Sequence, residues 1–210
     1  MTTLPLNCNL LCASGAAYDI DPTTGKYVPD PIFSKAVAYS SNPTPIAADT
    51  INACLVGQTE IGIIVAFRGT LAPKEPDGWY DWLQDLFAVP VAYKNLPGQV
   101  HEGFLNAVNA ILPQVISAAT AFNPGPANPV YVTGHSKGGG MAPIAAYLLK
   151  QTADIPIKQV VTFAAPKSGN SAFASGYQSV FKNHTRYENY GDLVPLLPPA
   201  DGFVGLLAHV

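Results

Sequence analysis

The stretch Val130–Ala142 reads VYVTGHSKGGGMA: β-branched residues run into a serine flanked by glycines, and a helix-forming run follows. Gly134, Ser136 and Gly138 fit the pattern G-x-S-x-G. Between a strand and a helix, this pattern predicts a nucleophile elbow. Such a turn is so tight that side chains two residues before and two after the serine must be absent. The alternative is an ordinary glycine-rich turn, and the rest of the chain has to decide between the two.

Strands and helices alternate around this turn. Apolar runs predict strands over Pro129–Thr133 and Gln159–Ala164, with a helix over Lys137–Lys150 between them. His101–Ala119 carries its apolar residues on one stripe, which predicts a long amphipathic helix. This alternation is typical of an α/β fold with a mostly parallel central sheet and helices on both faces. Further predicted elements are helices over Leu6–Tyr18, Ile32–Tyr39 and Ser171–Tyr177, and strands over Thr50–Val56, Glu60–Phe67 and Val180–Glu188.

The chain shows no internal repeat and no linker that would divide its 210 residues. This length suits one domain with a sizeable core, so we expect a single domain. Apart from the short helix in the first of them, Asp21–Pro45 and Leu71–Gly98 are expected to be Pro-rich connections.

Charged side chains are sparse: they make up 12% of the residues, against 48% for hydrophobic ones. Lys and Arg number 11 against 14 Asp and Glu, so the net charge is −3, and no basic run occurs. This pattern argues against a nucleic-acid partner. The low charge suits a neutral, apolar ligand, and it suits an ordinary small globular domain equally well.

The sequence contains no apolar run close to the roughly 20 residues that span a bilayer. Met1–Tyr18 lacks a basic region and its apolar stretch is interrupted by asparagines, so we expect a structured helix there and not a signal peptide. Cys8, Cys12 and Cys54 are an odd number without metal-ligand spacing. We therefore expect buried free cysteines, not a disulfide framework or a metal site.

Few residues downstream of Ser136 can complete a catalytic triad. A serine hydroxyl is a weak nucleophile that needs an adjacent histidine, which is in turn oriented by a carboxylate. In α/β-hydrolases these residues follow in the order Ser, Asp or Glu, and His. Two histidines follow the elbow, His184 and His209. The acids between Ser136 and His209 are Asp154, Glu188, Asp192 and Asp201.

Asp192 and His209 fit this order best. Asp192 lies just beyond a predicted strand end, where such folds place functional groups, whereas Asp154 precedes a strand. His184 precedes Asp192 in the chain, so the order rejects it. The alternative is that Asp192 is a turn acid and His209 a terminal residue without a role. The elbow and the order favour the triad of Ser136, Asp192 and His209.

Four motifs together resemble the class 3 lipases, which are the fungal-type triacylglycerol lipases and their feruloyl-esterase relatives. The motifs are GHSKGG at the elbow, FRGT at Phe67–Thr70, VHEGF at Val100–Phe104 and DLVPLLPP at Asp192–Pro199. The resemblance runs from about Ile61 to His209. It implies a single α/β-hydrolase domain with a short lid, acting as a serine ester hydrolase without a metal or a cofactor.

The resemblance also assigns roles to single residues. Ser136 matches the nucleophile, Asp192 the triad acid and His209 the general base. Thr70 follows the Arg-Gly pair, where its N–H and hydroxyl would serve the oxyanion, and the N–H of Lys137 would be the second donor. Thr70 taken alone would be interpreted as a turn residue after a strand.

The segment Trp79–Val91, WYDWLQDLFAVPV, resembles the family's lid, and the lid region spans approximately residues 71–98. A short amphipathic helix there would cover an apolar cleft and swing onto a lipid surface. The side chains that would do so are Trp82, Leu83, Leu86 and Phe87. The alternative is that these residues are plain core. His101 and His135 are expected to be structural, at the base of the lid and at the elbow.

Three features depart from the family pattern. The chain ends one residue after His209, where relatives usually continue with glycine, so His209 is expected on a weakly anchored terminus. Lys137 replaces an apolar residue, which leaves its N–H unaffected and allows a cation near the cleft. The paired cysteines of many secreted relatives are missing, so the compartment stays open, although the family favours secretion.

Three functions are compatible with these residues. The leading one is a hydrolase of acylglycerols, whose substrate is a small ester or a lipid, with transient contact to a lipid interface. The second is an esterase for short or aromatic acyl groups, such as a feruloyl esterase. The third is a non-catalytic protein that keeps the hydrolase fold to bind a hydrophobic ligand, and the intact elbow, acid and base count against it.

Overall fold

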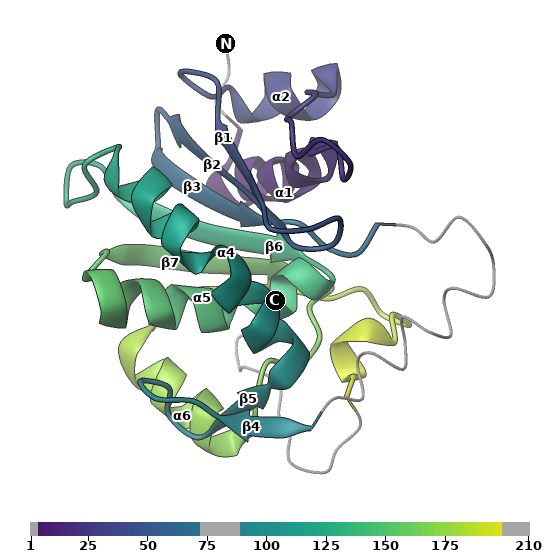
Figure 1. Cartoon of the computed structure of the whole chain (residues 1–210), viewed down its shortest axis with the longest axis vertical. Helices are drawn as coiled ribbons and strands as arrows, with labels where there is room; N and C mark the ends of the chain where they lie inside the picture. Colours follow the sequence, from purple (N-terminus) through teal and green to yellow (C-terminus); the bar gives the residue numbers. More distant parts are fainter. Residues whose placement is uncertain (1–3, 72–88, 199–210) are drawn as a thin grey trace.

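The central sheet of the fold has six strands (Figure 1). The computed structural model describes residues 4–71 and 89–198. In spatial order the strands are β1 (Thr44–Ala47), β2 (Ala53–Thr59), β3 (Gly62–Phe67), β6 (Val130–His135), β7 (Ile157–Phe163) and β8 (His184–Tyr187). β2 runs antiparallel to its neighbours β1 and β3, and β3, β6, β7 and β8 are parallel to one another. The predicted mostly parallel sheet is confirmed.

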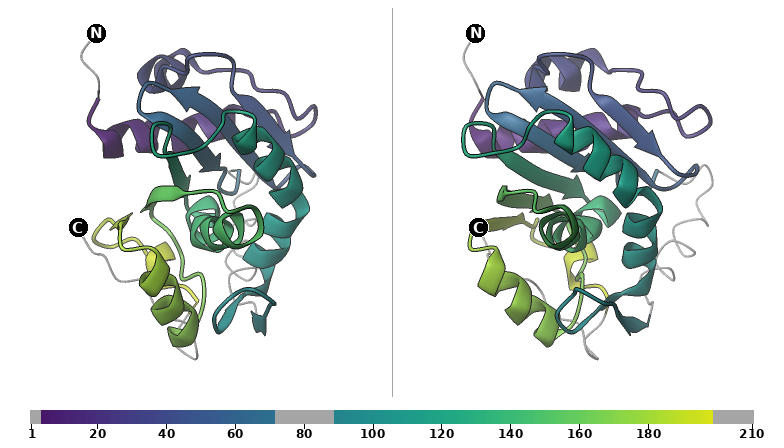
Figure 2. Two further views of the ribbon diagram at one scale, coloured as in Figure 1. Left: turned by 90° about the vertical axis from the view of Figure 1, so that its left-hand side faces the viewer. Right: turned by 60° about the vertical axis from the view of Figure 1, so that its left-hand side comes forward.

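Helices cover both faces of this sheet, as predicted (Figure 2). One face carries α1 (Leu6–Ala16), its 3-10 extension η1 (Ala17–Asp19) and, packed against α1, α2 (Pro31–Val37). The other face carries α4 (Glu102–Thr120), α5 (Lys137–Ala153) and α6 (Ser171–Val180). Each face therefore has an apolar core of its own, and the sheet lies between the two cores.

The core residues follow the patterns that predicted their elements. β3, in the interior of the sheet, is the continuous apolar run GIIVAF, and every one of its residues is buried. A parallel strand covered on both faces requires such a run. On α4 the predicted stripe packs into the core, and its members Phe104, Val108, Ile111 and Val115 are all buried.

Two segments form strands where the sequence predicted connections. β1 lies at the edge of the sheet, where Pro45 is tolerated although it has no N–H to donate. β4 (Pro90–Ala92) lies in the segment expected to be irregular, and it pairs with β5 (Gln99–His101) in a separate two-stranded ribbon. Strands this short contain too few residues to show a periodic pattern that would predict them.

β2 and β8 begin later than predicted, and local structure explains both starts. β2 begins at Ala53 and not at Thr50, because Oδ1 of Asp49 accepts the N–H groups of Ile51 and Asn52 and forms a turn. β8 begins at His184 and not at Val180, because α6 continues to Val180.

The cysteines are free, as predicted, but only Cys54 is buried. Cys8 is exposed and Cys12 is half-buried, so the expectation of burial is wrong for Cys8. Both lie on α1, which packs only one side against the sheet. Across residues 4–71 and 89–198, none of the helices combines the length and the apolar character needed to cross a membrane.

Candidate active site

Ser136 lies at the turn between β6 and α5 in a conformation that few non-glycine residues adopt, with φ 55° and ψ −127°. Strained backbone of this kind persists only where the surroundings enforce it. A Cβ atom at Gly134 would collide with the carbonyl of Gly138, and one at Gly138 would collide with the carbonyl of Phe67. The predicted elbow is confirmed, and both glycines are explained by close backbone approach.

Backbone hydrogen bonds hold the serine on either side of this turn. The N–H of Ser136 donates to the carbonyl of Phe163 at 2.9 Å, and the N–H of Gly140 donates to the carbonyl of Ser136 at 3.1 Å. Lys137 is the first residue of α5, so its N–H belongs to the helix terminus, where the helix dipole favours negative charge. The half-buried serine is therefore followed directly by the N–H of Lys137, one of the two predicted oxyanion donors.

The segment Phe67–Thr70 leaves the sheet at the same edge. Phe67 pairs with Gly134 at the end of the parallel strands β3 and β6. A Cβ atom at Gly69 would lie only 2.7 Å from the carbonyl of His135, the residue before the serine. The structure thus brings the half-buried Thr70 and the start of α5 to one edge, where both predicted oxyanion donors belong.

The side chain of Arg68 anchors the segment Phe67–Thr70. Its side chain is 1% exposed, and its guanidinium donates to the carbonyls of Ile20 at 2.7 Å and Thr50 at 2.8 Å. Burial lowers the pKa of Arg68, while the neighbouring Tyr18 and Asp49 raise it. Arg68 ties Phe67–Thr70, the predicted oxyanion segment, to the end of η1 and to the loop between β1 and β2.

Tyr18 connects the oxyanion segment to the elbow. Its hydroxyl lies 2.8 Å from Nδ1 of His135, and it accepts a hydrogen bond from the backbone N–H of Gly69. Burial raises the pKa of Tyr18 to about 12, against the opposing effects of Arg68 and of that N–H. Burial also lowers the pKa of His135, which the charge of Asp192 partly offsets. His135 is thus neutral near pH 7, consistent with its expected structural role.

Asp192 lies in the turn that follows β8, at the edge of the sheet that carries the elbow. Its Oδ1 accepts the N–H of Val194 at 2.9 Å, and its own N–H donates to the carbonyl of Asn189 at 3.0 Å. The carboxylate is half-buried, and its charge acts on His135 next to Ser136. The predicted nucleophile and the predicted acid are therefore on one side of the molecule.

The other candidate residues have partners of their own. His184 is buried, its Nε2 lies 3.2 Å from Oγ1 of Thr162, and burial together with Arg186 lowers its pKa to about 3. Asp154 ends α5 away from the elbow, and its exposed carboxylate pairs with Lys150 at 3.1 Å. Glu188 pairs with Arg186. Asp201, the remaining candidate acid, lies outside the described residues.

The side chain of Lys137 extends to the loop between β1 and β2. Its Nζ donates to Oδ1 of Asn52 at 2.7 Å. Burial acts to raise the pKa of Asp49 in this loop, but the N–H groups of Asn52 and Ile51 and the charge of Lys137 lower it overall. The cation that departs from the family pattern thus binds a loop that Arg68 also holds.

Exposed apolar side chains flank Asp192. Tyr190, Leu193 and Leu196 project from the turn and from the 3-10 helix η2 (Val194–Leu196), with Leu193 67% exposed and Leu196 60% exposed. Exposed leucines beside the predicted triad acid suit contact with an apolar ligand. The predicted lid residues Trp82, Leu83, Leu86 and Phe87 lie outside the described residues, and so does His209.

Three contributors were missed by sequence reasoning: Tyr18, Arg68 and Asn52. Arg68 belongs to the FRGT motif, which was the one available signal. Tyr18 ends a predicted helix, and Asn52 belongs to a predicted strand, so neither had a local pattern that indicated a contact with the elbow. Within residues 4–71 and 89–198, no group of three His, Cys, Asp or Glu side chains is placed to hold a metal ion.

Comparison with known sequences gives a consistent set of relatives. The family model for lipase (class 3) matches residues 64–202. A lipase from Rhizomucor miehei is 33% identical over 149 residues, which cover 69% of this chain and 39% of that protein. Secreted mono- and diacylglycerol lipase 2 from Gibberella zeae is 30% identical over 172 residues, which cover 66% of this chain and 40% of that protein. The chain thus spans less than half the length of these two curated relatives.

The solved structures that resemble this chain are also lipases. A triacylglycerol lipase whose catalytic centre is described as a serine protease triad matches with a TM-score of 0.72 at 28% identity, over 97% of this chain and 77% of that one. A native lipase–propeptide complex from Rhizomucor miehei matches with a TM-score of 0.71 at 27% identity, over 94% of this chain and 63% of that one. Thr70, Ser136 and Asp192 lie within the family match, whereas Tyr18 and His209 lie outside it.

Proposed function

The chain belongs to the class 3 lipase family, and on that premise we propose that it hydrolyses carboxylic esters of the acylglycerol class through an acyl-enzyme on Ser136. The observation that carries this proposal is the backbone of Ser136, held at φ 55° at the start of α5 and close to the oxyanion segment. A strained serine in this setting is the arrangement that exposes a nucleophile to a substrate.

In the proposed mechanism, Oγ of Ser136 attacks the ester carbonyl while His209 takes the serine proton and passes it to the leaving alcohol. A water then attacks the acyl-enzyme with His209 as the base, which releases the acid and restores the serine. Asp192 orients the histidine and stabilises its cation. This sequence of steps needs neither a metal nor a cofactor.

Negative charge develops on the carbonyl oxygen in both halves of the reaction. We assign the N–H groups of Thr70 and Lys137 and the hydroxyl of Thr70 as its donors. Losing one donor of this type typically costs about 10²–10³ in kcat. The position of both residues at the edge that carries Ser136 supports this assignment.

The apolar substrate class is supported by the relatives, which are lipases, and by the exposed leucines beside Asp192. We also propose that residues 1–210 form one domain with a lid within approximately residues 71–98. In that lid, Trp82, Leu83, Leu86 and Phe87 would cover the cleft in water and contact lipid when it opens.

A fluorophosphonate probe tests the nucleophile, and peptide mapping locates the adduct. We expect an adduct on Ser136 and none after Ser136→Ala, which should also abolish turnover of p-nitrophenyl esters beyond a small residual rate. Ser171→Ala is the matched control, since Ser171 is an exposed serine at the start of α6. Near wild-type turnover by Ser136→Ala would overturn the assignment.

Hydrolysis measured across acyl-chain lengths, from butyrate esters to triolein emulsions, tests the substrate class. We expect turnover to extend to long-chain acylglycerols. Turnover confined to short or aromatic acyl esters would instead indicate an esterase. The absence of an adduct on Ser136, together with no turnover of any ester, would indicate a ligand-binding protein and would contradict the proposed hydrolase.

A further inference from the structure

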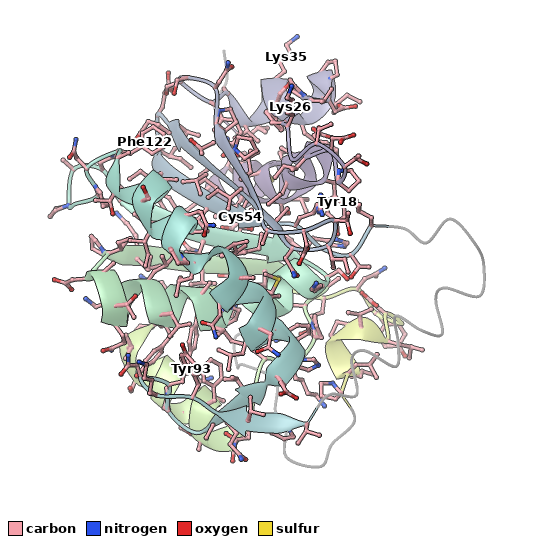
Figure 3. The ribbon with its side chains drawn as sticks, viewed as in Figure 1. Tyr18, Lys26, Lys35, Cys54, Tyr93 and Phe122 are labelled. Atoms are coloured by element: carbon pink, nitrogen blue, oxygen red, sulfur yellow. The ribbon has the colours of Figure 1, made fainter. Side chains whose placement is uncertain are left out.

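Tyr18 has no role in the proposed mechanism, although its hydroxyl lies between two parts of the candidate site. It belongs to η1, the 3-10 extension of α1, and so comes from outside the segment that matches the family model. Figure 3 labels Tyr18 near the ends of the central strands, on the side where β3 leaves the sheet. The contact with His135 crosses 117 positions of the chain.

The hydroxyl of Tyr18 has a hydrogen-bond partner in each of these two parts. It accepts from the backbone N–H of Gly69, so its single proton is available for Nδ1 of His135, 2.8 Å away. A histidine that accepts at Nδ1 is neutral and carries its proton on Nε2. The burial that keeps the Tyr18 hydroxyl protonated and His135 neutral preserves this arrangement near neutral pH.

The two partners of Tyr18 are the immediate neighbours of two proposed catalytic groups. Gly69 precedes Thr70, and His135 precedes Ser136. The backbones of Gly69 and His135 also lie close together, because a Cβ atom at Gly69 would approach the carbonyl of His135. The same Cβ atom would collide with the Tyr18 hydroxyl. A shift of Tyr18 would therefore move Thr70 relative to Ser136.

We propose that Tyr18 is a positioning residue of the ester hydrolase, whose hydroxyl fixes the separation between the oxyanion segment and the nucleophile elbow. This inference rests on the proposed function. Donors stabilise an oxyanion only when they are held where its charge develops, and a displacement of about 1 Å can lower a rate about 10²-fold. Tyr18 touches neither substrate nor reacting atoms, and it acts through Gly69 and His135.

Tyr18→Phe tests the proposal because it removes one oxygen atom and keeps the ring. We expect kcat for soluble p-nitrophenyl butyrate to fall about 10-fold while KM changes less than about 2-fold, since the loss affects the transition state. The rate of phosphonylation of Ser136 by a p-nitrophenyl phosphonate should fall by a similar factor. All rates are expressed per phosphonate-titratable site, so any unfolded fraction does not enter the comparison.

Tyr39→Phe is the matched control. The Tyr39 hydroxyl is buried without a hydrogen-bond partner among the described residues, so its removal should change neither kcat nor the phosphonylation rate. A kcat for Tyr18→Phe equal to that of Tyr39→Phe would overturn the proposal, as would a lower melting temperature with unchanged kcat. If the wild type neither hydrolyses esters nor reacts with the phosphonate, the proposed function fails. If the wild type is active and the Tyr18 variant matches it, only the positioning role fails.

Discussion

At the scale of single residues, Asp192 combines a local anchor with a charge that acts on the elbow. The N–H of Val194 donates to its Oδ1 at 2.9 Å, and its charge partly offsets the lowering of the His135 pKa by burial. Asp192→Asn retains an oxygen for the N–H of Val194 but would favour the wrong tautomer of His209, the proposed general base. We expect kcat to fall on the order of 10⁴-fold with little change in melting temperature.

Asp154→Asn is the control for this measurement, since Asp154 is an exposed acid at the far end of α5. Its kcat for p-nitrophenyl butyrate should equal that of the wild type. A small effect of Asp192→Asn, similar to that of Asp154→Asn, would remove Asp192 from the triad and leave it as a turn acid.

Residues that belong to short motifs could be predicted from the sequence, and residues that act across the fold could not. Ser136 and the glycines around it follow from a five-residue pattern whose steric reason is local. The contact of Tyr18 with His135 and that of Arg68 with Ile20 span 117 and 48 positions, so only the packed structure brings them together. The role of His209 stays a prediction, because it lies outside the described residues.

At the scale of secondary-structure elements, the pairing of β7 with β8 buries a histidine that cannot easily be charged. Val160 of β7 pairs with His184 of β8, and burial followed by the charge of Arg186 lowers the pKa of His184 to about 3. An unfolded histidine titrates near 6.5. Between these values the unfolded state binds a proton that the folded state does not, so the free energy of unfolding falls as the pH falls.

We therefore expect His184 to make the protein less stable by about 1.4 kcal/mol for each pH unit between roughly pH 6 and pH 4. Denaturant unfolding of the wild type and of His184→Gln over this range measures the contribution, since the glutamine does not titrate. The free energy of unfolding of the wild type, taken relative to that of His184→Gln, should fall as the pH falls. A difference that is independent of pH would show that the folded protein protonates His184 as readily as the unfolded chain does.

The elements in the interior of the fold were predicted best, for a physical reason. β3 and β7 are covered on both faces by helices. β3 is therefore an unbroken apolar run, and the buried second half of β7 is nearly so. β1 and β4 are edge strands that contain prolines and exposed residues, and their pairing depends on their neighbours. The sequence of an edge strand therefore predicts its structure less well than that of an interior strand.

At the scale of the whole molecule, the parallel sheet gathers the ends of β3, β6 and β8 at one edge. The oxyanion segment, the elbow and the turn with Asp192 follow these strands, although more than 120 positions separate Thr70 from Asp192 (Figure 1). This arrangement follows the general rule that open α/β sheets place their ligands beyond the carboxyl ends of the strands. The same edge also carries the exposed leucines of the η2 region.

These leucines lead to a prediction about the physical state of the substrate. Exposing apolar surface to water costs about 25 cal/mol for each Å². Contact with an aggregated ester removes that cost for Leu193 and Leu196, so we expect the hydrolysis rate to rise more than proportionally once the ester exceeds its solubility limit. Leu193→Ser combined with Leu196→Ser should weaken this rise and leave turnover of soluble butyrate esters largely unchanged, because Asp192 and its anchor are retained.

The control pair is Val28→Ser with Ile32→Ser, which removes two similarly exposed apolar side chains. Val28 lies shortly before α2 and is 65% exposed, and Ile32 lies on α2 and is 75% exposed. Rates are measured against total ester concentration through the solubility limit for the wild type and both double variants. Because these side chains do not belong to the segment around Asp192, the control should follow the wild-type curve. A smooth saturation of the wild type, or an equal effect of both pairs, would show that the leucines beside Asp192 do not contact the lipid surface and would favour a soluble ester as the substrate.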